Sequence, residues 1–184
     1  MCYEDTVALS LLRAIAEGEQ RALAQLFRMT SGRTVAYLCR VLRDHDSVED
    51  ILIDTYVEVW RRASHFDGRS EVLTWIIGIA RNLAMNWLKR HREYASLDAF
   101  EDEVFSEDPL EDHFQRALVW SALNDLPENH REILALALLR EFPYEQIAAL
   151  LHIPVATVKT RVFYAKAAMR EQLRAMGVAR ADVL

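Results

Sequence analysis

An acidic segment divides this chain of 184 residues into two parts. Residues 93–112 hold nine acidic side chains and no lysine or arginine, and their apolar residues follow no sustained period. Ser96, Ser106 and Pro109 within the segment are typical of a connection between domains. We therefore predict a first domain over residues 1–94, a linker over 95–112 and a second domain over 113–184.

Both domains are expected to be helical. Glycine occurs five times and proline four times, and no stretch of convincing length alternates between apolar and polar residues as a strand does. Hydrophobic residues make up 52% of the chain, which is enough to build a small core in each domain. The sequence thus predicts an all-α fold of two small helical domains joined by an acidic linker.

The charge distribution favours an anionic partner in spite of the net charge of −6. Outside residues 93–112 the chain carries 19 acidic and 22 basic residues, so the excess of acid lies in the predicted linker. Between Val155 and Arg180, six basic residues stand against one acidic residue. A C-terminal region with this charge suits binding to nucleic acid.

Composition and motifs argue against several other classes of protein. Two cysteines, Cys2 and Cys39, are too few for a disulfide framework or a zinc site, and they suit a reducing cytosol. The chain has no signal-peptide pattern, no apolar run long enough to span a bilayer, no glycine-rich phosphate loop and no His-Glu-x-x-His motif. We therefore expect a cytoplasmic protein that is not an enzyme and that uses no metal or cofactor.

Capping residues and turns place the helices. Asp5 or Thr6 is expected to cap the first helix, and Ser47 with Asp50 resembles a capping box that opens the third. Four helices are predicted in the first domain. The first ends near Gly18, and the second runs from Glu19 to about Leu42, with a possible interruption at 31–32. The third runs from Ser47 to about Ala63, and the fourth from Glu71 to about Tyr94. In the second domain, helices near 112–124 and 128–141 precede a short helix, a tight turn and a long final helix.

The strongest local motif lies at residues 143–161, Pro-Tyr-Glu-Gln-Ile-Ala-Ala-Leu-Leu-His-Ile-Pro-Val-Ala-Thr-Val-Lys-Thr-Arg. Pro143 suits a first helical turn, and His152 stands in the predicted turn, where a left-handed backbone would be strained. Pro154 then opens the next helix. An apolar stripe at i, i+3, i+4 and i+7 completes the pattern of a helix-turn-helix: Tyr144, Ile147, Ala148 and Leu151.

The final helix has two distinct sides at roughly 100° per residue. The predicted core side holds Val155, Val158, Val162, Ala165, Met169 and Leu173. The other side offers small and polar groups for base edges and cations for phosphates: Ala156, Thr157, Thr160 and Tyr164, flanked by Lys159, Arg161 and Phe163. The alternative is an ordinary amphipathic hairpin with a solvated basic face.

The helix predicted after Glu71 carries a second candidate surface for nucleic acid. Its apolar stripe consists of Leu73, Ile76, Ala80, Leu83, Ala84 and Trp87. The opposite side combines an aromatic ring, amides and cations, as a platform for unstacked bases does: Trp75, Asn82, Asn86 and Lys89, with Arg81, Arg90 and Arg92 nearby. For Trp75 the alternative of packing against a neighbouring helix stays open.

Five segments distributed over both predicted domains carry a resemblance to a known family. They are Ser-Val-Glu-Asp-Ile-Leu-Ile-Asp-Thr-Tyr-Val-Glu-Val-Trp (47–60), Phe-Asp-Gly (66–68), Thr-Trp-Ile-Ile-Gly-Ile-Ala-Arg-Asn (74–82), Leu-Pro-Glu-Asn-His-Arg-Glu-Ile-Leu (126–134) and Thr-Val-Lys-Thr-Arg-Val (157–162). Together they resemble the extracytoplasmic-function sigma factors of bacterial RNA polymerase. The resemblance extends from about Ala8 to Leu173. It implies a sigma-two domain that binds polymerase and the minus-ten element, and a sigma-four domain that reads the minus-thirty-five element.

The resemblance also implies roles for individual residues. The helix at 47–63 corresponds to the segment that docks on the clamp helices of the largest subunit of core RNA polymerase, through Glu49, Asp50, Asp54 and Glu58. Ile53 replaces a glutamine that is often found there. The minus-ten residues would be Phe66, Asp67, Gly68 and Arg69 of the base-capturing loop, with Trp75, Asn82, Asn86, Lys89 and Arg90. The minus-thirty-five residues would be Thr157, Lys159, Thr160, Arg161, Phe163 and Tyr164, the last at a position where many members carry arginine.

The partners implied are core RNA polymerase, promoter DNA and an anti-sigma factor. The acidic linker would either replace nucleic acid in a basic channel of the polymerase or serve as a solvated spacer. Thr55 lies on the docking helix and is a candidate phosphorylation switch. The competing hypothesis is a stand-alone helix-turn-helix regulator whose first domain senses a ligand or dimerises, which would bind its operator without polymerase.

Overall fold

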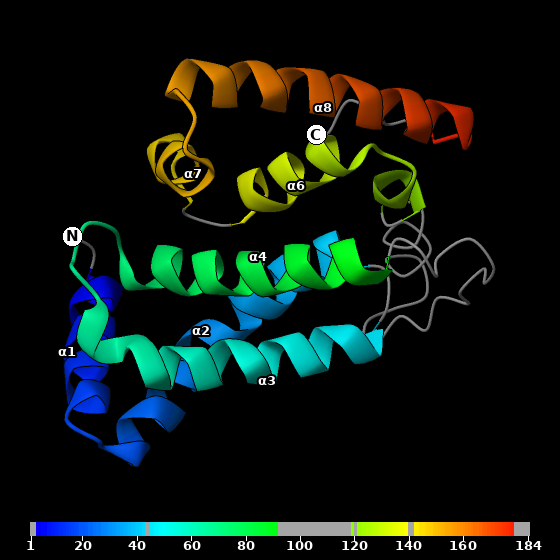
Figure 1. Cartoon of the computed structure of the whole chain (residues 1–184). Coiled ribbons are helices and arrows are strands. Elements are labelled where there is room, and N and C mark those ends of the chain that lie inside the picture. The colour runs from blue at the N-terminus through cyan, green and yellow to red at the C-terminus, as the bar shows by residue number, and fades with distance from the viewer. Residues whose placement is uncertain (1–2, 43–44, 92–118, 120, 140–141, 179–184) are drawn as a thin grey trace. The chain divides into compact units, whose positions relative to one another are not determined.

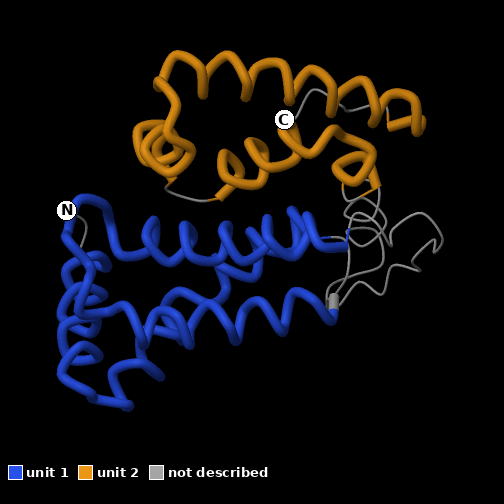
Figure 2. Tube along the Cα trace, viewed as in Figure 1, with its two compact units in different colours: residues 1–96 blue, residues 97–184 orange. Residues whose placement is uncertain are grey.

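A computed structural model of the protein describes residues 3–42, 45–91, 119, 121–139 and 142–178. The chain forms two compact units, one within residues 1–96 and the other within residues 97–184 (Figure 2). Helices and turns account for the described residues, and no strand occurs among them. The all-α prediction is therefore confirmed, whereas the predicted linker lies outside the described residues.

The described residues of the first unit form four helices and one short 3-10 helix, and the four helices are labelled in Figure 1. They are α1 (Tyr3–Ala16), α2 (Gln20–Val41), α3 (His45–Arg62), η1 (Ala63–His65) and α4 (Val72–His91). The helices pack on a core to which α1, α2, α3 and α4 each contribute fully buried side chains. Its members with 2% exposure or less are Leu12, Ile15, Leu26, Val59, Val72 and Ile76.

Most of the predicted helix boundaries in this unit are correct within two residues. Gly18 takes a left-handed backbone with φ +93°, and α1 ends at Ala16 just before it, because glycine tolerates the turn. Helix α2 continues without a break through the 31–32 pair, so no interruption occurs there.

The predicted capping roles in the first unit are wrong. Helix α3 starts at His45, and Ser47 is a buried residue inside its first turn rather than its cap. Asp5 lies within α1, which begins at Tyr3, and its carboxylate instead accepts a hydrogen bond from the first residue of α4, Val72. Both helices therefore begin at a residue that precedes the predicted capping residue in the sequence.

The second unit contains α6 (Glu128–Ala137), α7 (Tyr144–Leu151) and α8 (Val155–Ala175), and residues 121–124 are also helical. Helices α6 and α7 both pack against α8. Helix α6 ends at Ala137, four residues before the predicted end, and Phe142 is buried just before Pro143. The unit's fully buried side chains, with 2% exposure or less, include Leu123, Ile133, Leu134, Leu136, Ile147, Val158 and Met169.

Candidate nucleic-acid and partner surfaces

The turn between α7 and α8 has the predicted left-handed histidine. His152 has φ +53° and ψ +43°, and it is the only residue other than glycine with a positive φ among those described. The amide of Ile153 donates to the carbonyl oxygen of Ala148 at 3.1 Å, which satisfies a carbonyl at the end of α7. Pro154 then caps α8 with extended backbone. This turn fixes α8 against α7 as a helix-turn-helix requires.

Helix α8 has the two sides that its sequence predicts. Five of the six predicted core residues are buried to 3% exposure or less, and Val155 is half-buried. On the other side Lys159, Thr160 and Arg161 are exposed. Phe163 and Tyr164 are 66% and 59% exposed, and their rings meet edge to face with centroids 5.5 Å apart. The exposed side thus presents cations, a hydroxyl and two aromatic rings to solvent.

Helix α4 presents its amides and cations on one exposed face. Asn82, Asn86, Lys89 and Arg90 are all exposed, and the guanidinium of Arg90 donates to the backbone carbonyl of Asn86 at 3.3 Å. The core side of α4 is wider than the predicted stripe, because Ile77 and Ile79 are buried as well. The candidate face is therefore confined to one strip along the helix.

Trp75 packs against the core rather than standing free on that face. It is half-buried beside the core cluster of the first unit, and its ring meets the ring of Phe66 edge to face with centroids 5.3 Å apart. The packing alternative considered for this tryptophan is the one found. The Trp75 ring is therefore not an open platform for a base. It instead supports Phe66, the first residue of the loop 66–71 that precedes α4.

The loop at residues 66–71 is structured between fixed ends. Asp67 accepts a hydrogen bond from the amide of Arg69 at 3.1 Å, and its other oxygen lies 3.0 Å from the Arg69 guanidinium. Gly68 has φ +71°, which lets the chain turn between these two residues. Asp67, Gly68 and Arg69 are exposed, whereas Phe66 is half-buried. The middle of the loop is thus open to a ligand and its first residue is anchored.

The exposed face of α3 mixes acids with apolar side chains. Glu49, Asp50 and Asp54 are exposed as predicted. Ile53 is 61% exposed and Val57 is 40% exposed, and at 100° per residue both lie between Glu49 and the two aspartates. Val57 is not among the residues predicted to bind polymerase, and Ile53 was noted only because it replaces the glutamine often found at its position in the family. The available signal was the presence of two apolar residues on the polar side of an amphipathic helix.

Glu58 differs from the other three acids. Its carboxylate oxygens lie 3.1 Å from the Arg61 guanidinium and 2.6 Å from that of Arg62, within the same helix. The hydrogen bond from Arg61 lowers the pKa of this carboxyl, and the charge of Arg62 acts in the same direction. Its negative charge is therefore balanced by two neighbouring cations, whereas Glu49, Asp50 and Asp54 form no ion pair with another described residue.

Thr55 is not accessible for phosphorylation in this fold. Its side chain has 0% exposure, and its hydroxyl donates to the carbonyl oxygen of Ile51 at 2.6 Å. A kinase would need to unfold α3 to reach it. The hypothesis of a phosphorylation switch at this residue is therefore not supported.

Within the described ranges, no helix is both long and apolar enough to cross a membrane. The same residues contain no group of three or more histidine, cysteine or acidic side chains placed to hold a metal ion.

Comparisons with known proteins place both units in one family. Residues 26–94 match Sigma-70 region 2, and residues 116–169 match Sigma-70, region 4. The ECF RNA polymerase sigma factor SigK of Mycolicibacterium vanbaalenii is 30% identical over 176 residues, covering 91% of this chain and 86% of that protein. The ECF RNA polymerase sigma-E factor of Escherichia coli K12 is 28% identical over 178 residues, covering 89% and 93%.

A solved structure agrees with these relatives. The sigma factor RpoE, in its co-crystal structure with the anti-sigma factor NepR from Bartonella quintana, matches with a TM-score of 0.69 and 27% identity. The match covers 82% of this chain and 96% of RpoE. Two sigma regions in the family's order and relatives aligned over nearly the whole chain exclude the stand-alone regulator and the enzyme classes. The chain belongs to the extracytoplasmic-function sigma factors of RNA polymerase, and its function is to direct transcription initiation.

Proposed function

We propose that this sigma factor works through three separate surfaces. The exposed face of α3 binds the clamp helices of core RNA polymerase, the loop 66–71 with α4 binds the minus-ten element, and the exposed side of α8 reads the minus-thirty-five element. The observation that carries the proposal is the charge of these faces. Acids mark the first, whereas exposed cations mark the two DNA surfaces, one in each unit.

The polymerase contact is supported by the mixed character of α3. The exposed acids Glu49, Asp50 and Asp54 attract a basic partner surface over a distance of about 8 Å at physiological salt. Ile53 and Val57 add apolar area that a partner would bury, at about 25 cal/mol per Å². Because Glu58 is already paired with Arg61 and Arg62, we assign it a smaller share of the contact than Asp50 and Asp54.

The minus-ten contact is supported by the loop geometry and the exposed amides of α4. Capturing a base that has left the duplex costs a few kcal/mol of unstacking. We propose that Asp67, Gly68 and Arg69 surround the extruded base. Asn82, Asn86, Lys89 and Arg90 would hold the adjoining strand, with amides for base edges and cations for phosphates.

The minus-thirty-five contact is supported by the helix-turn-helix and by the exposed side of α8. We propose that Lys159 and Arg161 contact phosphates. Thr157, Thr160, Phe163 and Tyr164 would then meet base edges in the major groove. Tyr164 has a bulky ring where many members carry arginine, so we propose that the preferred base differs from theirs at the position it reads.

We further propose that an anti-sigma factor controls this chain, as NepR accompanies RpoE in the solved complex. The site of action is the cytoplasm, where core polymerase and the chromosome meet. Residues 95–112 would act as an acidic linker, either within a basic polymerase channel or as a solvated spacer.

The proposal is tested by fluorescence anisotropy and run-off transcription with purified core polymerase and a promoter library. The protein alone should bind promoter duplex weakly, near the non-specific range of about 10⁻⁴ to 10⁻⁶ M. Core polymerase should raise promoter affinity by orders of magnitude, because the two DNA contacts then act together. It should also make the minus-ten strand reactive to permanganate. Tight, sequence-specific binding by the free protein that polymerase does not improve would contradict this assignment of surfaces.

A further inference from the structure

We propose that Asp5 of α1 is a positioning residue for the loop 66–71, and that it thereby controls selection of the minus-ten base. The inference rests on the proposed function of that loop in base capture. Asp5 does not contact DNA in this proposal. It acts by holding the helix end from which the loop extends.

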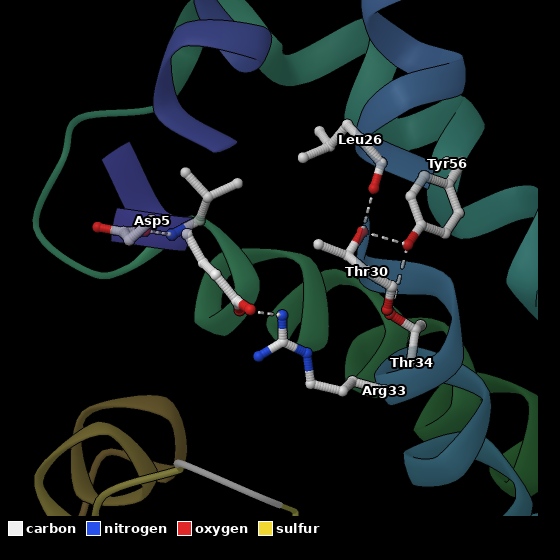
Figure 3. A network of polar contacts seen from close by, with 8 residues as sticks. Asp5, Leu26, Thr30, Arg33, Thr34 and Tyr56 are labelled. Carbon is white, nitrogen blue, oxygen red and sulfur yellow. Dashed lines mark hydrogen bonds and ion pairs between the residues drawn. The ribbon is translucent and has the colours of Figure 1, made fainter. Parts of the chain in front are cut away.

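The central observation is a hydrogen bond between residues 67 positions apart. The Asp5 carboxylate accepts it from the backbone amide of Val72, the first residue of α4, with 2.9 Å between oxygen and nitrogen (Figure 3). The first amides of a helix have no partner inside that helix and carry the positive end of its dipole. A carboxylate from α1 therefore caps α4 with favourable charge as well as a hydrogen bond.

Helix α1 also holds the other end of the loop 66–71. Ala63 of η1, just before the loop, is 5% exposed and belongs to the core cluster that contains Ala8 and Leu12 of α1. Helix α1 packs against both η1 and α4. Since α1 contacts the elements on both sides of residues 66–71, it sets the distance between the two ends of the loop.

The middle of the loop depends on these fixed ends. Asp67 and Arg69 contact each other, but their side chains are 56% and 88% exposed, so an exposed ion pair contributes little to order. A loop that is already ordered loses less conformational entropy when a ligand binds. Releasing the Val72 amide would loosen the α4 end, and base capture would then have to restore that order.

The test uses holoenzyme assembled from the full chain and core polymerase. Its probes are premelted promoter fragments in which each base of the non-template minus-ten strand is replaced in turn. The base captured by the loop is the one whose preference is lost in Asp67→Ala. At that position, the measured ratio is the affinity for the probe with the preferred base divided by the affinity for the probe with the replaced base. Asp5→Ala should reduce this ratio about 2- to 30-fold, which is the change in an equilibrium constant that corresponds to the loss of a helix cap. Preferences at the other positions should not change.

Two further variants separate positioning from general stability. Asp5→Asn should retain the preference, because its amide oxygen can still accept the Val72 hydrogen bond. Glu4→Ala is the matched control: it removes the same charge from the neighbouring residue and breaks a 3.1 Å ion pair with Arg33 instead. It should leave the ratio unchanged. Each ratio compares two probes with one enzyme preparation, so a reduced folded fraction cancels.

The outcomes distinguish the two proposals. If Asp67→Ala lowers the preference while Asp5→Ala does not, or if Asp5→Ala weakens every position equally, the positioning role of Asp5 is overturned and base capture stands. If Asp67→Ala alters no position, base capture by the loop is wrong, and the role of Asp5 is overturned with it.

Discussion

The hydroxyl groups of Thr30 and Tyr56 lie 2.7 Å apart inside the first unit and join α2 to α3 (Figure 3). Thr30 gives its own proton to the carbonyl oxygen of Leu26, so the Tyr56 hydroxyl is the donor between them. Both side chains are buried, with 1% and 5% exposure. This bond therefore links α2 to α3, the helix that carries the proposed docking face.

Replacing Tyr56 by phenylalanine should lower the free energy of unfolding by about 1 kcal/mol at pH 7. The substitution removes the buried donor and leaves the ring in place, including its contact with Phe27 at a centroid distance of 4.7 Å. Urea denaturation of the two proteins measures the difference. Equal stability would mean that this hydrogen bond contributes nothing to the fold.

The difference in the free energy of unfolding between the wild-type protein and Tyr56→Phe should become smaller at alkaline pH. Burial raises the pKa of Tyr56, although its bonds to Thr30 and Thr34 act in the opposite direction. The unfolded tyrosine ionises first, from about pH 10, so wild type loses stability as the pH rises from there towards the folded pKa. Tyr56→Phe has no such group. A difference that grows between pH 7 and pH 10.5 would contradict this linkage.

Reversing the charge of Asp50 and Asp54 to lysine should weaken binding to core polymerase at least about tenfold, because like charges would then face a basic partner. Both residues are exposed, so the circular dichroism spectrum should not change. Glu17→Lys with Glu19→Lys is the matched control, since it makes the same change of charge at exposed residues of the same unit. Co-purification with core polymerase that is equal for both double variants would rule out the docking face.

On α8, Lys159→Ala should weaken binding of the holoenzyme to the minus-thirty-five element for all sequences alike. Loss of one phosphate contact should reduce the salt dependence of binding by about one unit of slope. Tyr164→Ala should instead change which base is preferred at one position. Titrations over a range of salt with each single-base variant of the element measure both effects. The assignment of phosphate and base contacts is wrong if the two variants behave alike.

Replacing His152 by glycine should raise the free energy of unfolding of the second unit by about 0.5–1 kcal/mol, since glycine adopts the left-handed backbone without steric strain. His152→Ala serves as the comparison, because it removes the imidazole and keeps the strain. Thermal denaturation should rank glycine above both wild type and alanine. An alanine variant as stable as the glycine variant would show that the side chain, and not the backbone, limits stability here.

The sequence by itself determined the features that depend on local spacing. The two sides of α8, the left-handed turn at His152 and the exposed amides of α4 follow from a period of 3.6 residues and from the conformations that single residues allow. These signals lie within one or two helical turns, so no knowledge of distant contacts was needed.

The tertiary structure decided the features that join distant segments. Asp5 has a sound local signal for capping its own helix, but its carboxylate lies against Val72, which only the packing of α1 on α4 brings near. Trp75 was equally compatible with a DNA face and with the core until Phe66 was placed beside it. Thr55 was a candidate phosphorylation switch by sequence, but the packing around α3 buries its side chain completely. A helical period places a side chain on a face, whereas the choice of neighbour depends on the close packing of several helices at once.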